Sequence, residues 1–72
     1  MKDFNIAVGS RVKKKRLELG FTREKLSEKA SISDKFIYDI EVGKKGISAA
    51  VLYRVAISLE VSADWILGIN EG

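Results

Sequence analysis

The chain has 72 residues and a net charge of +3, and it contains neither cysteine nor histidine. A chain this short forms one domain with a small core, and the missing residue types exclude a disulfide, a thiolate metal site and the commonest general base. It has no apolar run of membrane-spanning length and no signal-peptide core, so we expect one domain over residues 1–72, located in the cytoplasm.

The pattern of apolar residues predicts five short helices and no strands. Apolar positions at helical spacing define a first helix, and each later helix is preceded by a Ser or Thr whose side-chain oxygen can cap its N-terminus. The expected ranges are about 5–19, 22–29, 33–42, 48–59 and 62–67, with caps at Thr22, Ser33, Ser48 and Ser62 and with stops at Gly20, Gly43 and Gly68. The fold class is therefore an all-α bundle.

The second and third predicted helices are short and about four residues apart, which is typical of a helix-turn-helix arrangement. On the third helix, Phe36, Ile37 and Ile40 share one face, which we expect to be buried. The opposite face is expected to be exposed. Besides Val42, it carries Asp34, Lys35, Tyr38 and Asp39.

Glu41 falls at the border between these two faces. Arg16, on the inward side of the first helix, can reach it, and a half-buried ion pair would then determine how the two helices meet. Since no nucleophile, metal cluster or phosphate-binding glycine loop accompanies the pair, we interpret it as structural. We expect no enzymatic activity, metal, cofactor or small-molecule ligand.

The positive charge is concentrated in the N-terminal third of the chain. Residues 11–25 hold seven Lys or Arg and two Glu, whereas residues 60–72 hold three acidic residues and no basic one. A basic surface suits an anionic polymer such as a nucleic acid. Because a solvated helix surface can carry the same charges, this feature alone does not decide the function.

Three segments, "RLELGFTREKL", "IYDIEVGKKGIS" and "LEVSADWIL", occur in an order and at a spacing that resemble a known family. The family is the lambda repressor-like helix-turn-helix domain of lambdoid phage repressors, Cro and the wider Cro/C1-type (XRE) regulators. The resemblance covers about residues 8–67. It implies five helices, with the third, at about 33–42, as the recognition helix in the DNA major groove, and it implies an internal ion pair between Arg16 and Glu41.

The resemblance also implies which residues contact DNA. Base-reading positions correspond to Asp34, Lys35 and Asp39, and we expect Tyr38 either to pack on a thymine methyl group or to reach a phosphate. Phosphate-binding positions correspond to Arg23, where the family usually has Gln, and to Ser33, Lys44 and Lys45. The two carboxylates give the exposed face of the third helix a net charge of −1, so each needs a donor.

The last predicted helix carries an apolar group, Trp65, Ile66 and Ile69, that corresponds to a dimer contact in relatives. The alternative is that Trp65 belongs to the core. One such domain reads few bases, so we expect a homodimer, formed either in solution or only on DNA, that binds an operator with an inverted repeat.

Two functions from different classes follow from these patterns. The first is a sequence-specific regulator, in particular a repressor, that binds double-stranded DNA. The second is a protein-interaction module on the same fold, similar to an antitoxin or a regulator-binding protein, in which the acidic residues of the third helix bind a protein and DNA binding is weak or absent.

Overall fold

The computed structural model describes residues 2–69, which form five α-helices and no strand. The helices are α1 (Lys2–Glu18), α2 (Arg23–Ala30), α3 (Asp34–Glu41), α4 (Ala49–Leu59) and α5 (Ala63–Leu67). The prediction of a five-helix, all-α fold is therefore confirmed. The largest difference in helix bounds is the start of α1, which begins at Lys2 rather than at about residue 5.

Local sequence signals define most of the helix ends. At each predicted cap, the hydroxyl accepts a hydrogen bond over 3.0–3.2 Å from the backbone amide three residues later; the caps are Thr22, Ser33, Ser48 and Ser62. Gly20, Gly43 and Gly68 follow α1, α3 and α5 with φ values of 77°, 82° and 80°, a conformation that glycine adopts without steric cost. Ser31 and Glu60 adopt the same left-handed conformation after α2 and α4 without being glycine.

All five helices contribute to one hydrophobic core. Ile37 and Ile40 on α3 are buried as predicted, and Phe36 packs at the edge of the core. The remaining buried apolar side chains are Val8, Val12, Leu26, Ala30, Val55, Ala56, Leu59 and Ile66. The burial of these side chains supplies most of the driving force for folding.

The backbone of α1 approaches the C-terminal end of α3 closely at Gly9. A Cβ atom at Gly9 would overlap the carbonyl oxygen of Ile40 and would lie 2.8 Å from the carbonyl oxygen of Glu41. Only a residue without a side chain allows the two backbones to approach this closely.

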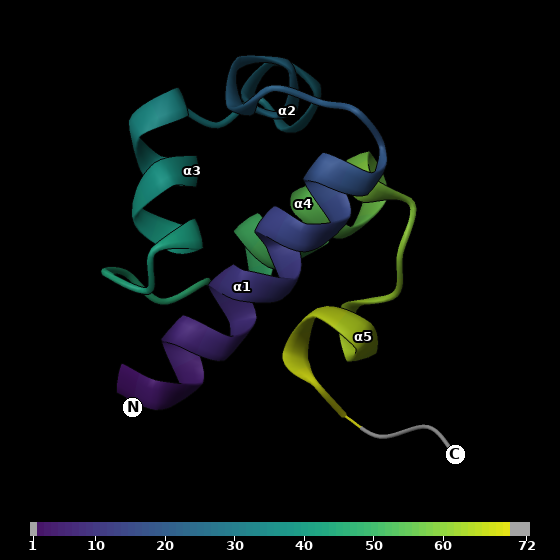
Figure 1. Ribbon diagram of the computed structural model, residues 1–72. Helices are drawn as coiled ribbons and strands as arrows, with labels where there is room; N and C mark the ends of the chain where they lie inside the picture. The colour runs from purple at the N-terminus through teal and green to yellow at the C-terminus, as the bar shows by residue number, and fades with distance from the viewer. Residues whose placement is uncertain (1, 70–72) are drawn as a thin grey trace.

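Figure 1 shows how this packing places the helix-turn-helix pair. In this view α2 lies at the top and α3 at the left, joined by a short turn, and α1 runs diagonally across the front of α4. No helix among the described residues is long and apolar enough to cross a membrane. Over the same residues, no group of three or more His, Cys, Asp and Glu side chains could hold a metal ion.

Candidate nucleic-acid interface

The N-terminal half of α3 presents polar side chains to solvent. Asp34, Lys35 and Tyr38 are exposed, as is Val42 just beyond the helix. Ser33 caps α3 and uses its hydroxyl to accept from the amide of Phe36, so this oxygen is already engaged within the helix. Four of the five positions that the sequence placed on the exposed face therefore lie there.

Asp39 is the exception, and its predicted exposure is wrong. Its side chain is only 1% exposed, whereas that of Lys35 is 75% exposed. The Lys35 ammonium lies 3.3 and 3.4 Å from the two carboxylate oxygens, and the Lys45 ammonium lies 3.7 Å from one of them. The segment after α3 folds back over Asp39, because the backbone amides of Lys44 and Lys45 donate to the Asp39 carbonyl oxygen at 2.8 and 3.2 Å. A helical wheel of α3 contains only the residues of that helix, so it could not predict that the following segment covers Asp39.

The charge state of Asp39 follows from these contacts. Burial raises the pKa of its carboxyl group, but the hydrogen bond from Lys35 and the positive charges of Lys35, Lys44 and Lys45 lower it by more, so the pKa lies below its ordinary value. Asp39 is therefore ionised at neutral pH. Asp39 therefore contacts Lys35 and Lys45 as a carboxylate.

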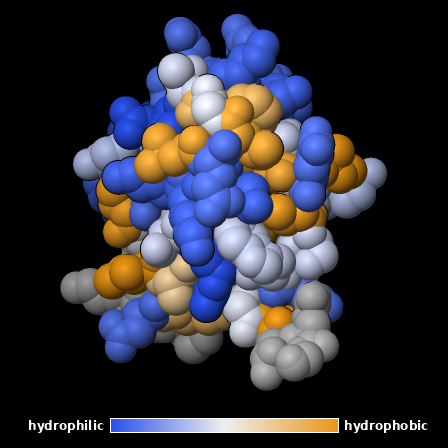
Figure 2. Space-filling view, turned by 45° about the vertical axis from the view of Figure 1, so that its right-hand side comes forward, coloured by the Kyte–Doolittle hydropathy of each residue, from blue (hydrophilic) through white to orange (hydrophobic). Residues whose placement is uncertain are grey.

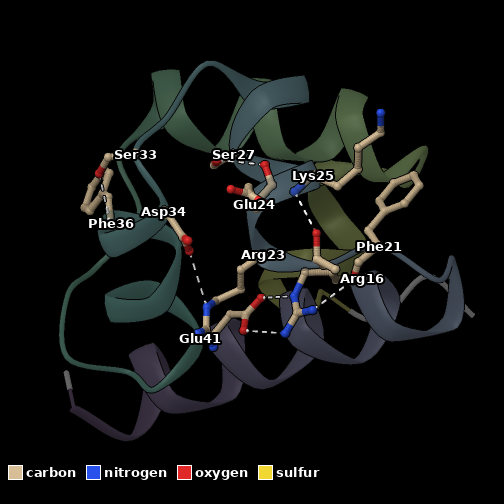
Figure 3. Close-up of polar contacts among 11 residues, drawn as sticks. Arg16, Phe21, Arg23, Glu24, Lys25, Ser27, Ser33, Asp34, Phe36 and Glu41 are labelled. Carbon is tan, nitrogen blue, oxygen red and sulfur yellow. Dashed lines mark hydrogen bonds and ion pairs between the residues drawn. The ribbon is translucent and has the colours of Figure 1, made fainter.

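A second group of contacts joins α2 to α3. Nε of Arg23 lies 3.4 Å from Oδ1 of Asp34, and the Arg23 guanidinium lies 5.1 Å from the centre of the Tyr38 ring. Figure 3 shows Arg23 and Asp34 pointing toward one another from the two helices. Both side chains are substantially exposed, so the pair contributes little to stability. It does give the Asp34 carboxylate a cationic partner.

The loop between α3 and α4 supplies further cations. Lys44 and Lys45 are exposed, and the Lys45 ammonium also lies 5.3 Å from the centre of the Phe36 ring. Together with Arg23 and Lys35, they outnumber Asp34 and Asp39 by two, so this surface has a net charge of +2. The net charge expected for the exposed face of α3 alone was negative, and the cations on α2 and on the following loop make the net charge of the whole surface positive.

Arg16 and Glu41 lie beneath this surface and are buried. Nε and Nη2 of Arg16 donate to the two carboxylate oxygens of Glu41 at 2.6 and 3.0 Å, and Nη1 donates to the carbonyl oxygen of Phe21 at 2.9 Å (Figure 3). The structure thus brings together the pair that the sequence suggested. The geometry is bidentate, which defines the orientation of α3 relative to α1.

The predicted dimer contact on the last helix is only partly exposed. Ile66 is 0% exposed and belongs to the core, so its prediction as a dimer contact is wrong. The periodicity of five residues could not show that α5 turns this side chain inward. Trp65 is half-buried, and the Lys15 ammonium lies over its ring, 5.4 Å from the ring centre. Ile69 is 54% exposed. In the view of Figure 2, hydrophobic patches alternate with hydrophilic side chains.

The sequence did not predict the ion pairs that neutralise the carboxylates of Asp34 and Asp39 on α3. The spacing of four residues between Lys35 and Asp39 was a usable signal, because such residues are neighbours on a helix. No local pattern relates Arg23 to Asp34, or Lys45 to Asp39. These contacts arise only when the turn after α2 and the loop after α3 take their positions.

The five helices, with an exposed polar α3 after a short turn from α2, define a helix-turn-helix protein. Comparison with known proteins agrees with this geometry. Residues 9–70 match the family model described as a helix-turn-helix domain. The chain belongs to this helix-turn-helix family, and the resemblance to Cro/C1-like DNA-binding regulators that its sequence indicates is confirmed.

Solved structures of two regulators have the same fold. The clp gene regulator ClgR from Corynebacterium glutamicum is 26% identical, with a TM-score of 0.83 over 89% of this chain and 83% of that chain. A second ClgR structure gives a TM-score of 0.84, with 68% of that chain covered. The restriction-modification controller protein C.AhdI from Aeromonas hydrophila is 18% identical, with a TM-score of 0.83 over 86% of this chain and 94% of that one. The likeness to C.AhdI shows the fold alone.

Proposed function

We propose that the protein is a repressor that recognises a specific double-stranded DNA sequence with α3 in the major groove. One observation carries this proposal: α3 exposes Lys35 and Tyr38, while Arg23 of α2 lies against Asp34 and Tyr38 and Lys45 of the following loop lies against Asp39. A reading helix flanked on both sides by cations matches the two phosphate backbones that border a major groove. The proposed activity needs no cofactor and places the protein in the cytoplasm.

The proposed roles divide into base reading and phosphate binding. Lys35 donates to guanine O6 or N7, Tyr38 packs on a thymine methyl group, and Asp34 accepts from cytosine N4 while Arg23 shares its charge. Phosphates are bound by Arg23, Lys44 and Lys45, by the backbone near Ser33, and by the N-terminal amides of α4. Asp39 is excluded from this set of base readers because its carboxylate is buried.

The proposed DNA target is an inverted repeat bound by two copies of the chain. A single α3 reads only a few base pairs, and two-fold symmetry doubles the site. The half-sites would lie about 34 Å apart, one turn of B-DNA. The exposed Ile69 and the exposed part of Trp65 remain as the dimer contact. Because this apolar contact is small, we expect the two copies to associate weakly in solution and to form a stable dimer on DNA.

The alternative function, a protein-interaction module, depended on acidic residues of α3 facing a partner. The ion pairs weaken this argument, because Asp34 and Asp39 each have a cationic partner within the protein. Binding to a protein at a strength insensitive to salt, without affinity for DNA, would favour that alternative.

The experiment that tests the proposal is selection from a randomised duplex DNA library at roughly physiological salt. We expect the purified protein to enrich an inverted repeat with half-sites about ten base pairs apart. Its affinity for that site should decrease steeply as the salt concentration rises, because phosphate contacts release counterions. Failure of the folded protein to enrich any sequence would contradict specific DNA recognition.

Replacement of Lys35 and of Lys44 by alanine separates the two proposed roles. Lys35→Ala should reduce discrimination at one base pair by about 1–3 kcal/mol and leave the other positions unchanged. Lys44→Ala should weaken binding to all sequences alike and reduce the slope of log K against log salt by about one unit. Fluorescence anisotropy titrations on the selected site and its single-base variants measure both effects. Identical behaviour of the two variants on every duplex would contradict this division.

A further inference from the structure

The carboxylate of Asp39 forms the floor of a surface hollow of about 440 Å³ beside α3. The hollow is lined by Asp39, Lys35, Lys45, Ser33 and Phe36. Although the carboxylate is 1% exposed, both ammonium groups above it are solvent-accessible, with side chains 75% and 56% exposed. An approaching ligand therefore meets the two ammonium groups, and the carboxylate lies beneath them.

This arrangement differs from an ordinary ion pair on a helix surface. An exposed pair four residues apart can separate at little cost, because water replaces each partner. The carboxylate of Asp39 is shielded from water, and its side-chain partners among the described residues are Lys35 and Lys45. If both lysines moved away to bind DNA, the carboxylate would face the DNA without a cationic partner, and its repulsion from the phosphates would be unfavourable. At least one ammonium must stay with Asp39, and Lys35 has the two closer contacts.

The number of donors on Lys35 then limits what it can recognise. An ammonium group has three N–H donors and no acceptor. One N–H can be shared between the two carboxylate oxygens of Asp39, which lie at similar distances of 3.4 and 3.3 Å. Two donors are then available for the base. In the major groove, guanine presents two adjacent acceptors, N7 and O6, whereas adenine places its N6 donor beside N7 and cytosine presents its N4 donor. Guanine is thus the base that matches both remaining donors.

We propose that Asp39 is a positioning residue that makes Lys35 selective for guanine by keeping its ammonium group above the surface of α3. The inference rests on the proposed function, since it assigns base specificity within the same DNA-binding site. Asp39 itself touches no base. In its absence, the flexible side chain of Lys35 can reach a phosphate, which every sequence offers.

The test compares Asp39→Asn with the wild-type protein on defined duplexes. The probes are the duplex enriched from the randomised library, its single-base variants, and a duplex of random sequence. We expect Asp39→Asn to bind the random duplex more tightly, with a salt slope steeper by up to about one unit. Its discrimination in favour of guanine at the Lys35 position should decrease roughly five- to hundredfold, with discrimination at other positions unchanged. Should asparagine be poorly accommodated, Asp39→Ala removes the same carboxylate.

The matched control is Glu18→Gln, which makes the same change of charge and also removes the acidic partner of a lysine, Lys15, but on α1 and at a residue with no proposed contact to DNA. It should retain the guanine preference. A second comparison introduces Asp39→Asn into the Lys35→Gln protein, where it should have no further effect on discrimination if Asp39 acts through Lys35. A loss of discrimination at all positions, or a further loss in the Lys35→Gln background, would indicate a purely structural role and overturn the inference.

The two proposals fail in different ways. If the wild-type protein enriches no sequence, the proposed function is contradicted and this inference with it. If the wild-type protein enriches a site and Asp39→Asn keeps full discrimination at every position, only the role of Asp39 is contradicted.

Discussion

Replacement of Gly9 by alanine should lower the free energy of unfolding by about 3 kcal/mol. The new methyl group would overlap the carbonyl oxygen of Ile40 and approach the carbonyl oxygen of Glu41 to 2.8 Å. These are backbone atoms, so no rotation of a side chain can relieve the contact, and α1 must move away from α3. Alanine is favoured over glycine within a helix by about 1 kcal/mol, a gain smaller than the expected loss. Urea denaturation measures the net change.

Gly46→Ala provides the matched control for this prediction. A Cβ atom at Gly46 would lie 3.4 Å from the side-chain oxygen of Asn5, which is a flexible group in near-ordinary contact. We expect a change of less than about 1 kcal/mol. Equal losses of stability in the two alanine variants would show that the close approach of α1 and α3 has no special role.

Glu41→Ala should destabilise the protein by about 3–5 kcal/mol. The substitution removes both acceptors of the Arg16 guanidinium, at 2.6 and 3.0 Å, and leaves a cation buried between α1 and α3. Its remaining hydrogen bond, to the carbonyl oxygen of Phe21, does not neutralise the charge. Most of the loss therefore comes from the unpaired arginine rather than from the attraction between the two groups.

This reasoning is tested by removing both charges together. The double variant Arg16→Met, Glu41→Leu should be more stable than Glu41→Ala, because apolar side chains of similar size can replace a buried pair at little cost. Glu18→Ala is the exposed control: Glu18 pairs with Lys15 at 2.9 Å on the surface of α1, where ion pairs contribute little. If Glu41→Ala and Glu18→Ala unfold at the same urea concentration, the Arg16–Glu41 pair is not structurally important.

The contact at Gly9 and the Arg16–Glu41 ion pair both determine how α3 is oriented relative to α1. The Gly9 contact sets how closely the C-terminal end of α3 approaches α1, and the bidentate pair sets its rotation. DNA recognition requires reading side chains held in a defined geometry. The structural residues beneath α3 are therefore as relevant to the proposed function as the exposed ones.

The sequence by itself determined the five helices and most of their ends. Each cap is an interaction between a side chain and an amide three residues away, and Gly20, Gly43 and Gly68 stop their helices through their own backbone conformation. Such signals act within one helical turn, so they are readable without knowledge of the fold. The inward stripe of α3 could be predicted for the same reason, since helical periodicity is a local property.

Only the tertiary structure decided which polar groups of the candidate site are available. Asp39 lies on the outer side of α3 by periodicity, but it is buried because the following loop folds back and places Lys45 over it. Ile66 is buried because α5 packs its side chain into the core. The partner of Asp34 comes from α2, across a turn. Exposure and charge pairing depend on segments that meet only after folding, and the pattern of one helix carries no information about its neighbours.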